Sequence, residues 1–191
     1  MKKERKNIFI ACAMVFLALA ISQSLAFHTV NVDTESIVTF GNLGLKIHET
    51  MLDENNREIP YSPENSTPLT RDGSQSRIVR VENTGRQPMF VRVSLDMEGT
   101  DRNGEMIDNA DALAGYTWNQ TDWTYSDGWY YYKRVLEPGS ETKELMTEVM
   151  FDIDRISAEY PGGNFKLDIS AQGVQSKNNE DEALKAVGWP R

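Results

Sequence analysis

The stretch MFVRVSLDM, residues 89–97, decides the fold class because its apolar and polar side chains alternate. Val91 and Val93 lie on one face and Arg92 on the other, and this period of two is typical of a β-strand. Residues 76–82 alternate in the same way. The turn-forming residues 83–88 separate the two segments, so we predict that the two strands form a hairpin-like pair.

Further segments have strand character and are separated by turn residues, and residues 177–187 have apolar side chains at helical spacing. We also predict a short helix within residues 105–113. Six or more strands with few helices predict an all-β fold. We expect an antiparallel β-sandwich, with one or two short helices in loops and at the C-terminus. The other predicted elements are strands at 43–47, 128–136, 144–153 and 165–175, a proline-containing loop at 51–73, and helices within 105–113 and 177–187.

Composition excludes several classes of function. The chain has 191 residues, of which 39% are hydrophobic, so we expect one globular domain. The formal net charge is -9 and the basic residues do not cluster beyond the first six positions, which disfavours nucleic acid and anionic lipid as partners. One cysteine and two histidines exclude a disulfide framework and a multi-cysteine zinc site. We predict no cofactor and no catalytic residues.

The N-terminus predicts export. A basic start is followed by the uncharged run from Ile8 to Ile21, which is too short for an ordinary membrane span and fits a signal peptide. Ser24 and Ala26 are small enough for the subsites of a signal peptidase. We predict cleavage between Ala26 and Phe27, which leaves residues 27–191 as a single domain. The alternative is an uncleaved leader, through which alone the chain would contact a membrane.

Several short motifs resemble one family in their order along the chain. The chain resembles the TasA/camelysin family, Gram-positive exported proteins that a SipW-type signal peptidase releases. The resemblance implies a jelly-roll-like domain that is secreted to the extracellular matrix or cell surface, where it polymerises into biofilm-matrix fibres. It also implies two partners besides the peptidase, namely other copies of the chain and an accessory matrix protein. The matching segments are Ala26–Phe27, FGNLGL (40–45), RVENTG (80–85), FVRV (90–93), GWYYY (128–132), EPG (137–139) and AQGVQ (171–175).

In such fibres the N-terminal segment of one subunit completes a sheet of the next. Here cleavage would free residues 27–36 as the donor segment, with Val30 and Val32 on one face and Phe27 and Thr29 on the other. A donated strand gains main-chain hydrogen bonds and places alternate side chains in pockets. The alternative is a locally paired N-terminus.

The camelysin name also implies a metal-dependent endopeptidase, which is our alternative function. A zincin needs His-Glu-x-x-His on a helix. The sequence places Leu52 where the second histidine would follow His48, and the only other histidine is His28. We therefore predict no metal-binding residues.

An aromatic-rich region suggests a third function, a monomeric cell-surface module that binds glycan or protein. In a strand, Tyr131 faces opposite to Tyr130 and Tyr132, and packing in the core is the commoner use of such rings. The candidate interaction surface comprises Trp118, Trp123, Trp129 and Tyr131.

Overall fold

The structure is a computed structural model that describes residues 43–62 and 73–189. The predicted cleavage after Ala26 and the donor segment 27–36 lie outside these residues. In the described part of the chain, no helix is long and apolar enough to cross a membrane. The strands are β1 (Leu45–Leu52), β2 (Glu58–Pro60), β3 (Ser74–Ser76), β4 (Ile78–Asn83), β5 (Met89–Thr100), β6 (Ala114–Trp118), β7 (Trp123–Ser126), β8 (Trp129–Tyr132), β9 (Met146–Phe151) and β10 (Asn164–Gln175); the helical elements are η2 (Ala110–Leu113), α2 (Ile153–Glu159) and η3 (Ala183–Lys185).

The strands form antiparallel sheets that pack as a sandwich. One sheet has the order β10-β5-β8-β7, and the others have the orders β2-β1-β4 and β3-β9-β6. Arg77 alone separates β3 from β4, and its backbone N–H donates to the Thr147 carbonyl of β9 at 3.0 Å. The two three-stranded sheets are therefore continuous with one another, and together they form the layer opposite the four-stranded sheet.

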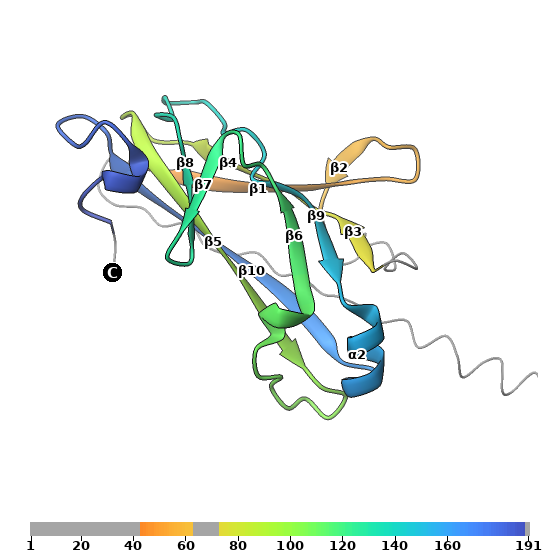
Figure 1. The fold of residues 1–191 in the computed structure, drawn as a ribbon. Coiled ribbons are helices and arrows are strands. Elements are labelled where there is room, and N and C mark those ends of the chain that lie inside the picture. Colours follow the sequence, from red (N-terminus) through yellow and green to blue (C-terminus); the bar gives the residue numbers. More distant parts are fainter. Residues whose placement is uncertain (1–42, 63–72, 190–191) are drawn as a thin grey trace, which may run out of the picture.

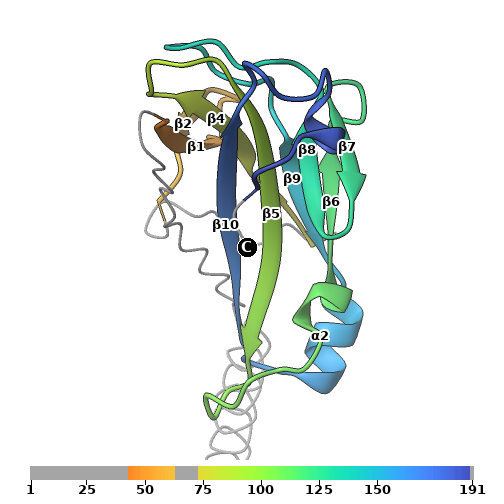
Figure 2. The same cartoon turned by 90° about the vertical axis from the view of Figure 1, so that its left-hand side faces the viewer.

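The main core lies between these layers. β5 and β10 pair over twelve residues each and lie side by side for most of the length of the molecule (Figures 1 and 2). Because alternate residues of a strand face the same way, β5 buries Val91 and Val93 while β10 buries Leu167 and Ile169 in the same cluster. Each fully buried aliphatic side chain of this kind stabilises the fold by about 1.5–3 kcal/mol. The predicted all-β antiparallel sandwich with short helices is confirmed.

The predicted pairing of residues 76–82 with 89–97 is wrong. β4 pairs with β1, whereas β5 pairs with β10 and β8, so the connection between them carries the chain from one layer to the other. This connection is an arch between the two layers, and the buried Asn83 side chain stabilises it through hydrogen bonds. Its amide donates to the carbonyls of Gln87 and Leu136, both at 2.9 Å, and its oxygen accepts the N–H of Gly85 at 2.9 Å.

Four other predicted elements are corrected. Part of the predicted loop 51–73 is a β1–β2 hairpin, whose turn is closed by the Asp53 carboxylate accepting the N–H groups of Asn55 and Arg57. The predicted helices 105–113 and 177–187 shorten to the 3₁₀ turns η2 and η3. The predicted strand 144–153 ends before α2, because the Asp152 side chain caps that helix by accepting the Arg155 N–H.

Candidate functional site

The outer edge of β10 is a long main-chain surface that other described strands do not cover. β10 is the end strand of its sheet and has twelve residues, whereas the opposite end strand, β7, has four. In residues 43–62 and 73–189, the only sheet partner of β10 is β5. Open edges of this kind recruit further strands, and proteins commonly shorten or charge them to prevent it.

The two halves of β10 differ in whether they carry charged side chains. Lys166 and Asp168 form an ion pair at 2.8 Å on the exposed face of the first half. The second half, SAQGVQ at residues 170–175, has no charged side chain. Charged side chains protect an edge from pairing, so residues 170–175 form the part of the edge that is best suited to accept another strand. We call these residues the edge segment.

A groove of about 480 Å³ lies beside the end of the edge segment. Its lining combines apolar and polar residues: Leu43, Gly173, Val174, Gln175, Lys177, Asn179, Val187, Gly188 and Trp189. Val187 is 67% exposed.

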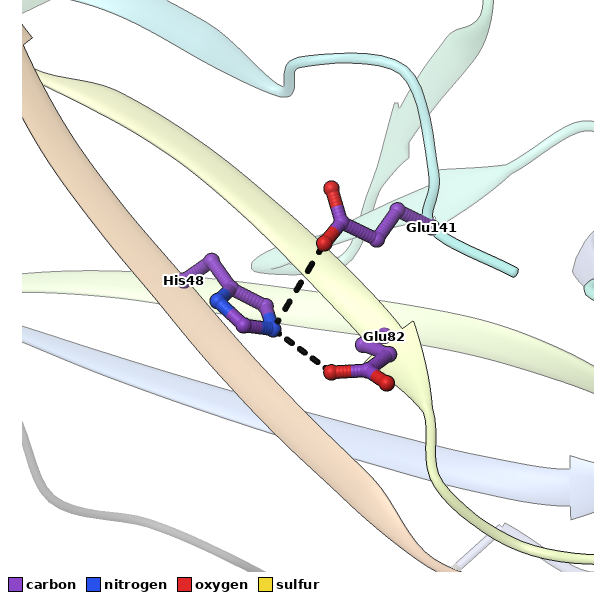
Figure 3. A group of neighbouring side chains, drawn as sticks. All are labelled: His48, Glu82 and Glu141. Atoms are coloured by element: carbon purple, nitrogen blue, oxygen red, sulfur yellow. Dashed lines mark hydrogen bonds and ion pairs between the residues drawn. The ribbon is translucent and has the colours of Figure 1, made fainter. Parts of the chain in front are cut away.

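A second site gathers His48, Glu82 and Glu141 (Figure 3). His48 lies on β1, Glu82 on β4, and Glu141 in the segment 139–145, which we call the edge strap. The His48 Nε2 atom is 2.7 Å from Glu82 Oε2 and 3.7 Å from Glu141 Oε1. The imidazole is thus placed between two carboxylates that come from different parts of the chain.

The edge strap lies along the outer edge of β4 and holds Glu141 in this position. Strap and strand exchange backbone hydrogen bonds, among them Asn83 N–H to Ser140 O at 3.0 Å and Thr142 N–H to Val81 O at 2.8 Å. The buried Thr142 hydroxyl also accepts the Val81 N–H at 3.0 Å. Glu82 and Glu141 are consequently paired directly across an antiparallel β-bridge.

Two cationic side chains, Arg80 and Lys46, lie close to this site in the strand register, and neither forms an ion pair with Glu82 or Glu141 within the described residues. The Arg80 guanidinium donates to both carboxylate oxygens of Glu58 on β2, and this hydrogen bonding is the main cause of the raised pKa of Arg80 and the lowered pKa of Glu58. Lys46 lies opposite Glu82 in the strand register, yet its amine makes no ion pair within the part of the chain that the structure describes.

Sequence reasoning singled out His48 but missed the cluster. His48 lies in β1 and not on a helix, so the helical arrangement of a zincin does not form at this position. The signal for the cluster is weak because Glu82 is distant in the sequence and Glu141 follows an irregular loop. Only the register of β1 against β4, and of the edge strap against β4, brings the three side chains together.

The candidate aromatic surface does not assemble as one patch. Trp123 is fully buried, and Trp118 packs edge-on against Tyr130 at 5.2 Å. The predicted alternation is confirmed, because Tyr130 lies in the main core whereas Tyr131 lies in a second cluster on the other face of the sheet. Core packing thus accounts for much of the aromatic-rich region.

Trp129 and Tyr131 instead belong to a cation–π cluster around Arg92. The guanidinium carbon of Arg92 lies 4.1 Å from the ring centroid of Trp129 and 4.7 Å from that of Trp189. Its NH2 group donates to the Gln172 side chain at 2.6 Å and its NH1 group to the Tyr131 hydroxyl at 3.3 Å. The arginine thus occupies one face of the Trp129 ring and one face of the Trp189 ring.

The other predicted site residues lie outside the described chain: the cleavage residues Ala26 and Phe27, and the assembly residues Phe27, Thr29, Val30 and Val32.

Comparisons with known proteins give little guidance. No protein-family model matches the chain, and no curated protein matches it. Among solved structures, it is similar to the CBM3a-L domain with flanking linkers from scaffoldin cipA of the cellulosome of Clostridium thermocellum. The identity is 13%, the match covers 81% of this chain and 83% of that one, and the TM-score is 0.24.

Proposed function

We propose that this chain is a secreted structural subunit of an extracellular or biofilm-matrix fibre. Its subunits assemble when the mature N-terminal strand of one copy, residues 27–32, pairs with the β10 edge of the next. The observation that carries the proposal is the outer edge of β10, which is twelve residues long and has no partner among the other described strands. The resemblance of the ordered motifs to the TasA/camelysin family supports the same function.

The edge and the donor match in length and in character. The edge segment contributes six uncharged residues, 170–175, and the donor supplies six residues, with Val30 and Val32 on one face and Phe27 and Thr29 on the other. At about 3.3 Å per residue, a strand of this length covers about 20 Å of edge. Val30 and Val32 would face the core, while Thr29 would face outward beside the partly exposed Ser170.

The groove beside the edge segment gives the donated strand an apolar contact in addition to its main-chain hydrogen bonds. Its wall at Val187 and Trp189 lies next to residues of β10. Alternate side chains of an added strand commonly occupy such pockets. Export regulates this assembly, because the segment is released only when the peptidase cuts before Phe27.

Cysteine crosslinking tests the contact directly. The only native cysteine, Cys12, lies in the predicted leader, so single cysteines introduced into the processed protein are unique. Thr29→Cys protein mixed with Ser170→Cys protein should form a crosslinked heterodimer with a short bismaleimide, which tolerates a small shift in register. Thr124→Cys on β7, the opposite edge of the same sheet, is the matched control and should remain uncrosslinked.

Two results would count against the proposal. Equal crosslinking to both edges would indicate random collision. A processed protein that stays monomeric at every concentration tested, without filaments in electron microscopy, would favour a monomeric cell-surface binding module instead.

A further inference from the structure

We propose that His48, Glu82 and Glu141 bind one divalent transition-metal ion of the Zn²⁺ class, which fastens the edge strap to β4 and β1. The site is structural, and it does not depend on the proposed assembly.

The ligand atoms lie close to the spacing of a metal site, since all are within 4.8 Å of one another. Around a tetrahedral zinc ion, nitrogen and oxygen ligands lie about 2.0–2.2 Å from the metal and therefore about 3.3 Å from one another. The two distances from His48 Nε2, 2.7 Å to Glu82 and 3.7 Å to Glu141, lie on either side of that value. Small rotations of two carboxylates on partly exposed side chains would bring both to the required spacing, and solvent can supply the fourth ligand.

The charge arrangement also favours a cation at this point. Glu82 and Glu141 are directly opposite across a β-bridge, and like charges in that position are destabilising. Arg80, which lies opposite His48 in the strand register, is held by Glu58 through two hydrogen bonds. Lys46, which lies opposite Glu82, makes no ion pair within the residues that the structure describes. The His48 Nε2 atom carries at most one hydrogen, and it lies 2.7 Å from Glu82 but 3.7 Å from Glu141, so Glu141 has the weaker contact. A divalent ion would compensate both carboxylates at once.

The donor set selects the class of metal. Mg²⁺ and Ca²⁺ prefer sites made of oxygen ligands alone, whereas an imidazole nitrogen together with carboxylates suits zinc and its neighbours. The three ligands come from β1, β4 and the edge strap, so the bound ion would crosslink segments that are far apart in the sequence. The bound ion is expected to stabilise the fold and to keep the edge strap paired with the outer edge of β4.

Calorimetric titration of zinc into the purified, metal-free protein tests this proposal. We expect one ion to bind per chain, and the thermal unfolding midpoint to rise with zinc concentration because the ion binds the folded state. His48→Ala and, separately, Glu141→Gln should weaken binding by about tenfold or more, because each removes a ligand. Millimolar magnesium or calcium should not compete.

The controls separate this site from adventitious binding. His28→Ala removes the only other histidine, and Glu137→Gln removes an exposed carboxylate from the same connection between β8 and β9; both should bind zinc as the wild type does. Glu141 is exposed, so its substitution is expected to leave the fold intact, which circular dichroism would check. Absence of saturable binding would overturn the proposal, and so would binding that His48→Ala leaves unchanged. Neither result depends on whether the protein forms fibres.

Discussion

At the scale of single residues, Asp53 shows how one side chain closes a turn. Its carboxylate accepts hydrogen bonds from the side chain and backbone of Arg57 and from the backbone of Asn55, and these bonds lower the pKa of Asp53 to about 2. Because these bonds favour the charged carboxylate, Asp53 stabilises the folded state at pH values above its ordinary pKa. This stabilisation of the fold is lost as the pH falls toward about 2. Arg57→Ala should raise the pKa of Asp53 toward its ordinary value, as carboxyl chemical shifts in an NMR titration would show. An unchanged pKa would mean that the backbone N–H groups alone hold the carboxylate.

A second residue-scale prediction concerns the buried ion pair of Arg77 and Glu49. The side chains are 1% and 6% exposed, and the Arg77 guanidinium lies 3.0 Å above the ring centroid of Tyr61. Burial raises the pKa of Glu49 and lowers that of Arg77, while each partner opposes the shift of the other. Removing one partner leaves an uncompensated buried charge, so Arg77→Met should destabilise the fold by about 3–5 kcal/mol in urea unfolding at neutral pH.

The pH dependence of the Arg77→Met variant provides a check. Without Arg77, the pKa of Glu49 in the folded state rises further above its unfolded value, so stability falls as the pH rises through the unfolded value. The destabilisation should therefore be smaller at about pH 4 than at about pH 7. A loss independent of pH would indicate that packing against Tyr61, and not the charge of Glu49, dominates. The double variant with Glu49→Gln should recover part of the stability, because it removes the unpaired charge.

At the scale of secondary-structure elements, Asn83 decides how β4 connects to β5. The fully buried amide satisfies the carbonyls of Gln87 and Leu136 and the N–H of Gly85. Asn83→Ala leaves these backbone groups without their partner, and each such loss costs about 1–3 kcal/mol. We expect a lower midpoint in urea unfolding, with the slope of the transition unchanged. Thr84→Ala, at an exposed neighbouring position, is the control and should change the midpoint little.

At the scale of the whole molecule, the open edge of β10 links the fold to the proposed assembly. Deleting residues 27–32 should give a folded, soluble protein that stays monomeric in size-exclusion chromatography. Val30→Pro should likewise prevent polymerisation because proline removes a main-chain donor, while thermal unfolding of the monomer remains nearly unchanged. Val30→Asp should weaken assembly by burying an unpaired charge. Val30→Leu, which keeps both the N–H and the apolar character, should still assemble.

The alternative of local pairing makes the opposite prediction. If residues 27–32 pair with their own chain, then the deletion, the proline variant and the aspartate variant should all lower the stability of the monomer. A clear loss of thermal stability in these variants would contradict donation between subunits.

The sequence alone determined the fold class and the faces of its strands. Alternation at 89–97 predicted a strand with Val91 and Val93 on one face, and the structure has both side chains in the core. The alternation of Tyr130, Tyr131 and Tyr132 was predictable for the same reason, because the pleat sends neighbouring side chains to opposite faces. These are local properties, since each depends only on the spacing of residues within one strand.

Tertiary structure alone decided which strands pair and which polar groups meet. The turn residues 83–88 are compatible with both a hairpin and an arch. Long-range contacts favour the arch, among them the hydrogen bond from Asn83 to the distant Leu136 carbonyl and the backbone hydrogen bonds between Met89 and Leu136. In the same way, His48 joins Glu82 and Glu141 through the register between β1, β4 and the edge strap. Such pairings depend on contacts between segments far apart in the sequence, which the local spacing of residues does not encode.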